Sequence, residues 1–188
     1  SGSGSVTFDK TAPTVSSVST TPNVSEVTDQ EHTNNNGGMS SRNVGWYIRQ
    51  SFTAGLSGTL KTFSVRAGSS GTATYTVKVF SGDGTSGTEL YSSSWTFTYD
   101  SLAYETYTFT SSIAVVAGQQ YTFYAVKTAG SHNENWLKSE SNTYSGGSGA
   151  ASSCSNCIDL YFKTTVAFAI AVSITDNITV TFSEAMEP

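Results

Sequence analysis

Residues 74–80 read Thr-Tyr-Thr-Val-Lys-Val-Phe, and apolar and polar side chains alternate along most of this stretch. In an extended chain, the alternation places Tyr75, Val77 and Val79 on one face and threonine and lysine on the other. Residues 94–99, Ser-Trp-Thr-Phe-Thr-Tyr, repeat the pattern. A helical period of 3.6 residues would scatter these apolar side chains around the axis. The pattern therefore predicts β-strands with one buried face.

The same alternation recurs on both sides of this stretch. Further alternating apolar residues are Phe63 and Val65, Tyr107 and Phe109, Tyr121 and Phe123, Leu160 and Phe162, and Ile178, Val180 and Phe182. Glycine-rich turn signals separate the runs, at 55–58, 68–71, 81–87, 117–118 and 145–149. Many short strands joined by such turns predict an all-β fold of the β-sandwich or jelly-roll type.

Composition narrows the possible partners. Charged residues make up 12% of the 188 residues, against about 25% in an average soluble protein. The net charge is −5, so no basic patch is expected for binding nucleic acid or an anionic membrane. No apolar run reaches the 18 residues of a membrane-spanning helix, and no membrane insertion is expected. The opening Ser-Gly-Ser-Gly reads as a linker scar or as part of an excised piece of a longer chain.

The two cysteines, Cys154 and Cys157, form a single C-x-x-C motif. A zinc site would need two further ligands, and His32 and His132 lie in unrelated contexts. No βαβ pattern surrounds the motif, which argues against a thioredoxin-like site. We expect a small disulfide formed in an oxidising compartment, with free thiols as the alternative.

Two segments near the ends resemble one known family. Residues 9–22 contain Thr-Ala-Pro-Thr-Val, and residues 174–188 contain Ile-Thr-Val-Thr-Phe-Ser-Glu-Ala-Met. Both resemble the first two strands of the bacterial Ig-like repeats found in tandem in surface proteins. In that family the two strands are nearly adjacent, whereas about 150 residues separate them here. The resemblance implies a domain inserted into an Ig-like repeat.

The middle of the chain resembles a jelly-roll module that recurs in large secreted and cell-surface bacterial proteins. The resemblance rests on residues 49–60, 79–90, 116–123 and 159–164. It implies an extracellular or cell-surface location and a fold similar to carbohydrate-binding jelly rolls.

These resemblances divide the chain into four parts. We expect a linker at 1–5, the first Ig-like strand at 6–22, the inserted jelly roll at 23–166 and the second Ig-like strand at 167–188. The fold class is thus a jelly-roll β-sandwich flanked by strands of an incomplete Ig-like domain. Two strands cannot form an Ig core alone. They are expected to pack on the inserted domain, or to be completed by strand addition from another copy or a neighbouring repeat.

The segment 131–144 is the first candidate binding site. It combines aromatic rings with amide and carboxylate groups, the side chains that contact the apolar face and the hydroxyls of a sugar. The candidate ligand-binding residues are Trp136, Tyr144, His132, Asn133, Glu134 and Asn135. The alternative is that Trp136 and Tyr144 only plug the end of the sandwich.

Three acidic residues could bind calcium. Asp29 and Glu31 precede a run of asparagines, and Asp83 lies between two glycines. Carboxylate and amide oxygens are ligands that calcium accepts, although the spacing is not that of an EF-hand. The alternative is that these residues lie in polar loops and turns, where aspartate binds its own backbone.

The sequence offers no nucleophile elbow and only two histidines, so we expect no enzyme. The expected function is a non-catalytic module of a bacterial adhesin or other surface protein, which binds a glycan or surface polymer through loops at one end of the sandwich. The alternative is a structural spacer or filament subunit, assembled by strand complementation through its terminal Ig-like strands.

Overall fold

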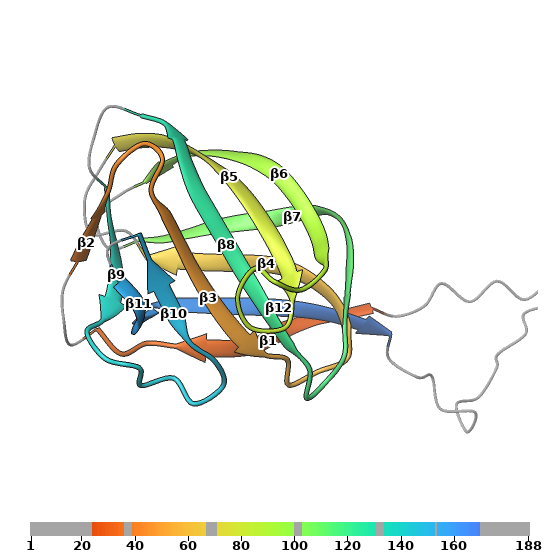
Figure 1. Ribbon diagram of the computed structural model, residues 1–188. Coiled ribbons are helices and arrows are strands. Elements are labelled where there is room, and N and C mark those ends of the chain that lie inside the picture. Colours follow the sequence, from red (N-terminus) through yellow and green to blue (C-terminus); the bar gives the residue numbers. More distant parts are fainter. Residues whose placement is uncertain are drawn as a thin grey trace, which may run out of the picture.

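The computed structural model describes residues 24–35, 39–66, 71–99, 103–130, 134–152 and 154–169. Within these ranges the chain is all-β, and it forms two antiparallel sheets that pack together as a β-sandwich (Figure 1). The strands are β1 (Val24–His32), β2 (Met39–Arg42), β3 (Tyr47–Thr53), β4 (Gly58–Arg66), β5 (Gly71–Ser81), β6 (Glu89–Tyr99), β7 (Tyr104–Val115), β8 (Gln120–Ala129), β9 (Glu134–Ser139), β10 (Gly149–Ala151), β11 (Cys154–Leu160) and β12 (Phe162–Ala169). The predicted all-β fold of the β-sandwich type is confirmed.

The two sheets differ in size. The small sheet has the order β1-β12-β4-β7, and the large sheet has the order β2-β9-β11-β10-β3-β8-β5-β6. In Figure 1 the strands β3, β8 and β5 of the large sheet cross in front of β12 and β4 of the small one. Within the described residues no helix is long and apolar enough to cross a membrane.

The alternation in the sequence becomes the division between core and surface. On β5 the side chains of Tyr75, Val77 and Val79 are fully buried, while the residues between them are partly exposed. Trp95 and Phe97 on β6 are buried in the same way. The strands predicted from period-two patterning therefore place their apolar face between the sheets.

A stack of three phenylalanine rings joins the two layers. Phe63 on β4 lies 3.9 Å from Phe123 on β8 and 5.4 Å from Phe162 on β12, measured between ring centroids, and each pair is nearly parallel at 3°. All three side chains are fully buried. Because a buried phenylalanine stabilises the folded state by roughly 1.5–3 kcal/mol, this stack is a central part of the core.

The described chain begins and ends on neighbouring strands. Val24, the first residue of β1, lies opposite Ala169, the last residue of β12. Strand β12 thus runs past the expected domain limit at residue 166. The predicted Ig-like strand at 6–22 and all but the first residues of the one at 167–188 lie outside the described residues.

Candidate functional site

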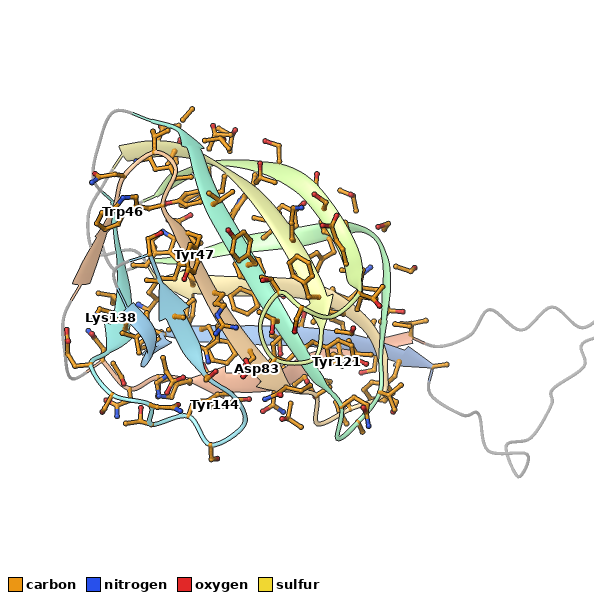
Figure 2. The ribbon with its side chains drawn as sticks, in the orientation of Figure 1. Trp46, Tyr47, Asp83, Tyr121, Lys138 and Tyr144 are labelled. Carbon is orange, nitrogen blue, oxygen red and sulfur yellow. The ribbon has the colours of Figure 1, made fainter. Side chains whose placement is uncertain are left out.

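A surface pocket of about 480 Å³ lies on the outer face of the large sheet. It is lined by Tyr47, Arg49, Asp83, Gly84, Thr85, Ser86 and Tyr124. Side chains alternate along a strand, and Ile48 and Phe123 are fully buried in the core, so Tyr47, Arg49 and Tyr124 project outward. Figure 2 shows Tyr47 beside β3 and Asp83 near the loop that curls in front of β8.

Two tyrosines form the aromatic side of the pocket. In the pairing of β3 with β8, Arg49 lies opposite Tyr124, and Tyr47 is opposite the residue two positions further along β8. This diagonal arrangement brings the rings of Tyr47 and Tyr124 into a stack, with centroids 5.4 Å apart and planes 19° apart. The edge of Phe80 supports Tyr124 at 6.3 Å. Burial is the main cause that raises the pKa of the Tyr124 phenol above its ordinary value, and the neighbouring Tyr47 adds to the rise.

The side chains of Arg49 and Asp83 form the polar side of the pocket. Arg49 Nη1 lies 3.7 Å from Asp83 Oδ1, and the side chains are 18% and 45% exposed. The hydroxyl of Ser148 donates to both oxygens of Asp83, at 3.2 and 3.4 Å. Opposite charges thus meet at the pocket, with the carboxylate held from a third segment of the chain.

The loop 82–88 between β5 and β6 is fixed onto the sheet and forms one wall. The N–H of Gly84 donates to Thr122 Oγ1 at 2.8 Å, and the Thr122 hydroxyl donates to the carbonyl of Gly82 at 2.7 Å. The N–H of Gly82 donates to the carbonyl of Gln120 at 2.7 Å. These bonds hold the wall in place before any ligand arrives.

Gly84 allows the loop to approach the guanidinium of Arg49. Its φ is +82°, a backbone conformation that favours glycine, and a Cβ added there would lie 2.5 Å from Arg49 Nη1. The Gly-Asp-Gly sequence at 82–84 lies in a bend of the chain, and this bend places the Asp83 carboxylate over the strand that carries Arg49.

Ser148 is itself fixed to β3. Its N–H donates to Ser51 Oγ at 2.8 Å, and its carbonyl accepts from the N–H of Ser51 at 2.9 Å. The hydroxyl that contacts Asp83 therefore projects from a backbone segment that precedes β10 and is hydrogen-bonded to β3.

The structure differs from the expectation for Trp136. This side chain is fully buried, and its ring packs 5.2 Å from Tyr75 and 6.4 Å from Trp95. It therefore presents no ring face to a ligand, and the alternative in which it fills the sandwich holds. Its Nε1 has no hydrogen-bond partner among the described residues.

Tyr144 lies elsewhere and is half-buried. Its hydroxyl donates to Gln30 Oε1 at 2.7 Å, and its ring meets Phe162 edge-on at 5.2 Å and His32 at 5.9 Å. Burial, followed by the negative charge of Asp29, raises the pKa of Tyr144 to about 12. Tyr144 thus joins its loop to β1 and is not brought together with Trp136.

The other residues expected at this site are only partly described. His132 and Asn133 lie outside the described residues. Glu134 and Asn135 belong to β9, but their side chains lie outside the described part of the chain. Their expected ligand contacts stay predictions.

The three carboxylates considered for calcium have different partners. Asp29 accepts the N–H of Gly55 at 3.0 Å. Burial raises the pKa of Asp29, and the hydrogen bonds from the backbone of Gly55 and Leu56 oppose that rise. Glu31 accepts the hydroxyl of Tyr104 at 3.1 Å, and Asp83 is in the pocket. Among the described residues, no three histidines, cysteines, aspartates or glutamates gather as metal ligands.

Cys154 and Cys157 both belong to β11, but their side chains lie outside the described part of the structure. The disulfide stays a prediction.

A buried polar network anchors the loop that carries Tyr144 and Ser148. Asp159 on β11 is fully buried and accepts the backbone N–H groups of Thr143 and Tyr144 at 2.6 and 2.8 Å. His32 bridges the Leu160 carbonyl through Nδ1 at 2.7 Å and the Thr143 hydroxyl through Nε2 at 2.9 Å. His32, the last residue of β1, therefore has a structural role: it holds this loop against β11.

Apart from Asp83, sequence reasoning missed the side chains of the pocket, namely Tyr47, Arg49, Thr85, Ser86 and Tyr124. A signal exists for those on strands, because Tyr47 and Arg49 alternate with the buried Ile48 and Gln50, and Tyr124 lies between the buried Phe123 and Ala125. The meeting of Tyr124 with Arg49 has no such signal, since it depends on the pairing of two strands far apart in sequence.

In comparisons with known proteins, no family model matches this chain, and no curated protein matches it.

Proposed function

We propose that the protein is a non-catalytic glycan-binding module of a bacterial surface or secreted protein, and that the sugar occupies the pocket of Tyr47, Arg49, Asp83 and Tyr124. One observation carries this proposal: a partly exposed aromatic pair shares a pocket with a carboxylate and a guanidinium. Tyrosine rings pack against the apolar C–H face of a pyranose ring. A carboxylate only accepts hydrogen bonds and a guanidinium only donates them, so together they satisfy sugar hydroxyls in both roles.

Size and rigidity support the same function. The volume of about 480 Å³ falls within the roughly 300–1,000 Å³ of small-molecule sites. The wall residue Gly84 is hydrogen-bonded to Thr122 on β8, and Ser148 is hydrogen-bonded to Ser51 on β3. Because these groups are already ordered, little conformational entropy is lost when a ligand binds.

The resemblance to modules of large surface proteins supports the setting. In such proteins a module of modest affinity gains avidity when several copies are displayed together. The extracellular location belongs to the same proposal.

Glycan-array binding of purified protein tests the proposal. We expect Tyr124→Ala to weaken binding to the best wild-type ligand by about tenfold, because the ring packing on the sugar is lost. Tyr161→Ala is the matched control, since Tyr161 is also half-exposed but joins β11 to β12, away from the pocket. Equal binding by Tyr124→Ala and the wild type would remove this pocket from consideration.

A second candidate function is that of a spacer or filament subunit that assembles by strand addition. The position of β1 favours it, because among the described strands β1 forms an edge of the small sheet and pairs only with β12. The unpaired side of an edge strand can accept another strand. Electron microscopy of the concentrated protein tests this candidate: ordered fibres are expected if strands add at β1, and monodisperse particles would count against it.

A further inference from the structure

We infer that the ligand of this pocket is an uncharged sugar with adjacent hydroxyls, selected by the Arg49–Asp83 pair and positioned with the help of Ser148; this inference rests on the proposed function. The inference specifies the class of sugar that binds, and three features of the pocket support it.

The first is the charge balance of the pocket. Of the seven lining residues, two are charged, Arg49 and Asp83, and their charges are opposite. An anionic sugar would approach the carboxylate of Asp83, and a cationic sugar would approach the guanidinium of Arg49. In each case the opposite member of the pair offsets the attraction of the other, so the pair offers no net charge to either kind of ligand. The net charge of −5 opposes an anionic ligand further.

The second is the balance of the surrounding surface. Across the sheet from Tyr124, the next outward residue is Lys78 on β5. Its Nζ lies 2.7 Å from Glu89 Oε2 in an ion pair, so its positive charge is offset locally. Lys78 therefore adds little net positive charge beside the pocket.

The third feature is the distance between the Arg49 guanidinium and the Asp83 carboxylate. The separation of 3.7 Å between Arg49 Nη1 and Asp83 Oδ1 exceeds the 2.7–3.2 Å of a hydrogen bond. Two hydroxyls on adjacent ring carbons can lie against such a pair, each donating to the carboxylate or accepting from the guanidinium. An isolated hydroxyl would satisfy only one of the two groups.

Ser148 acts on the ligand through Asp83. Its hydroxyl contacts both carboxylate oxygens, and its backbone is bonded to Ser51 on β3. Ser148 is thus a positioning residue that orients the carboxylate toward the pocket.

Titration calorimetry with two sets of probes tests the inference. The neutral probes are oligosaccharides of glucose, galactose and mannose, and the anionic probes are oligogalacturonides. We expect wild-type protein to bind at least one neutral probe and to bind oligogalacturonides at least about tenfold more weakly. Affinity for the neutral probe should change little between low and high salt, because no net charge is neutralised.

Variants separate selection from simple contact. Asp83→Asn should weaken binding of the neutral probe by about tenfold and shift the preference toward oligogalacturonides, since the negative charge beside the Arg49 guanidinium is removed. Ser148→Ala should weaken neutral binding about threefold without changing the preference. Ser92→Ala is the matched control, because it removes an exposed hydroxyl on β6 of the same sheet. This variant should bind like the wild type.

The outcomes distinguish the two levels of the proposal. If the wild type prefers oligogalacturonides in a salt-sensitive way, the neutral-sugar inference is wrong while glycan binding stands. If Asp83→Asn leaves the preference unchanged, Asp83 does not select the ligand. If the wild type binds no sugar in either set or on the array, the proposed function is wrong as well. Thermal unfolding of each variant confirms that lost binding does not come from lost folding.

Discussion

The amide Nε2 of Gln50 donates a 3.0 Å hydrogen bond to the carboxylate of Asp159, and neither side chain is exposed to solvent. The Oε1 atom of the same amide accepts the backbone N–H of Leu160 at 2.7 Å. One glutamine on β3 is therefore bound to both the side chain and the backbone of β11. Through Asp159 this network reaches the loop that also carries Ser148, so the core and the pocket are physically linked.

Removal of the Asp159 carboxylate should destabilise the fold. Asp159→Ala leaves the amide of Gln50 and the backbone N–H groups of Thr143 and Tyr144 without their acceptor. We expect the free energy of unfolding to fall by about 3 kcal/mol, measured by urea denaturation. Asp83→Ala is the matched control, because that carboxylate is partly exposed, and it should change stability by about 0.5 kcal/mol or less. Equal losses in the two variants would show that the buried network contributes little.

Gly84→Ala should remove binding while only modestly lowering stability. The added methyl group would strain a backbone at φ +82° and displace the Arg49 guanidinium. Gly118→Ala is the matched control, since Gly118 has φ +80° but no atom near its Cβ position. Both variants should lose about 1 kcal/mol of unfolding free energy, whereas only Gly84→Ala should lose sugar binding on the array. Unchanged binding by Gly84→Ala would mean that the position of Arg49 does not matter.

Trp136 should behave as a core residue. Trp136→Ala opens a cavity beside Tyr75 and Trp95 and should lower the free energy of unfolding by about 4 kcal/mol. Trp136→Phe should lose only about 1 kcal/mol, because it keeps an aromatic ring and removes a buried N–H that has no partner among the described residues. Chemical denaturation measures both, and glycan binding by Trp136→Phe should match the wild type. A selective loss of binding in that variant would restore Trp136 as a ligand contact.

The raised pKa of Tyr144 predicts that the stability of the fold changes in alkaline solution. Its pKa rises from the ordinary value of 10.0 to about 12 in the folded protein, because burial disfavours the phenolate. The folded state therefore holds the proton more tightly than the unfolded state. The resulting stabilisation is complete below about pH 10 and is lost as the pH rises through about 12.

Urea denaturation between pH 9 and pH 12 measures this effect. The unfolding free energy of the wild type should fall more steeply in that window than that of Tyr144→Phe, by up to about 1.4 kcal/mol per pH unit. Tyr144→Phe should also be less stable at neutral pH by about 1 kcal/mol, because the hydrogen bond to Gln30 is lost. Parallel pH profiles for the two proteins would contradict the raised pKa.

The sequence was sufficient for the core strands and insufficient for the pocket. Tyr75, Val77 and Val79 alternate with polar residues, and burial follows that pattern directly. Residues 136–139 do not alternate and give no strand signal, yet all four are buried in β9, which lies inside the large sheet between β2 and β11. Local patterning cannot report a burial that comes from strands elsewhere in the chain.

The pocket shows the same limit. That Tyr47 and Arg49 face outward follows from alternation on one strand. Their meeting with Tyr124 depends on the register of β3 with β8, and their meeting with Asp83 depends on a loop that folds back across β8. Both are long-range relationships, which short-range periodicity does not contain.

The pairing of Val24 with Ala169 has a mechanical consequence. These two residues, where the described chain begins and ends, lie at the same end of one antiparallel strand pair. A pulling force applied at Val24 and Ala169 would open β1 from β12 one residue pair at a time, instead of shearing every hydrogen bond of the pair together. A load passed between them needs to cross only the short gap that separates the two residues, so the rest of the described sandwich, including the large sheet, lies off the line of tension.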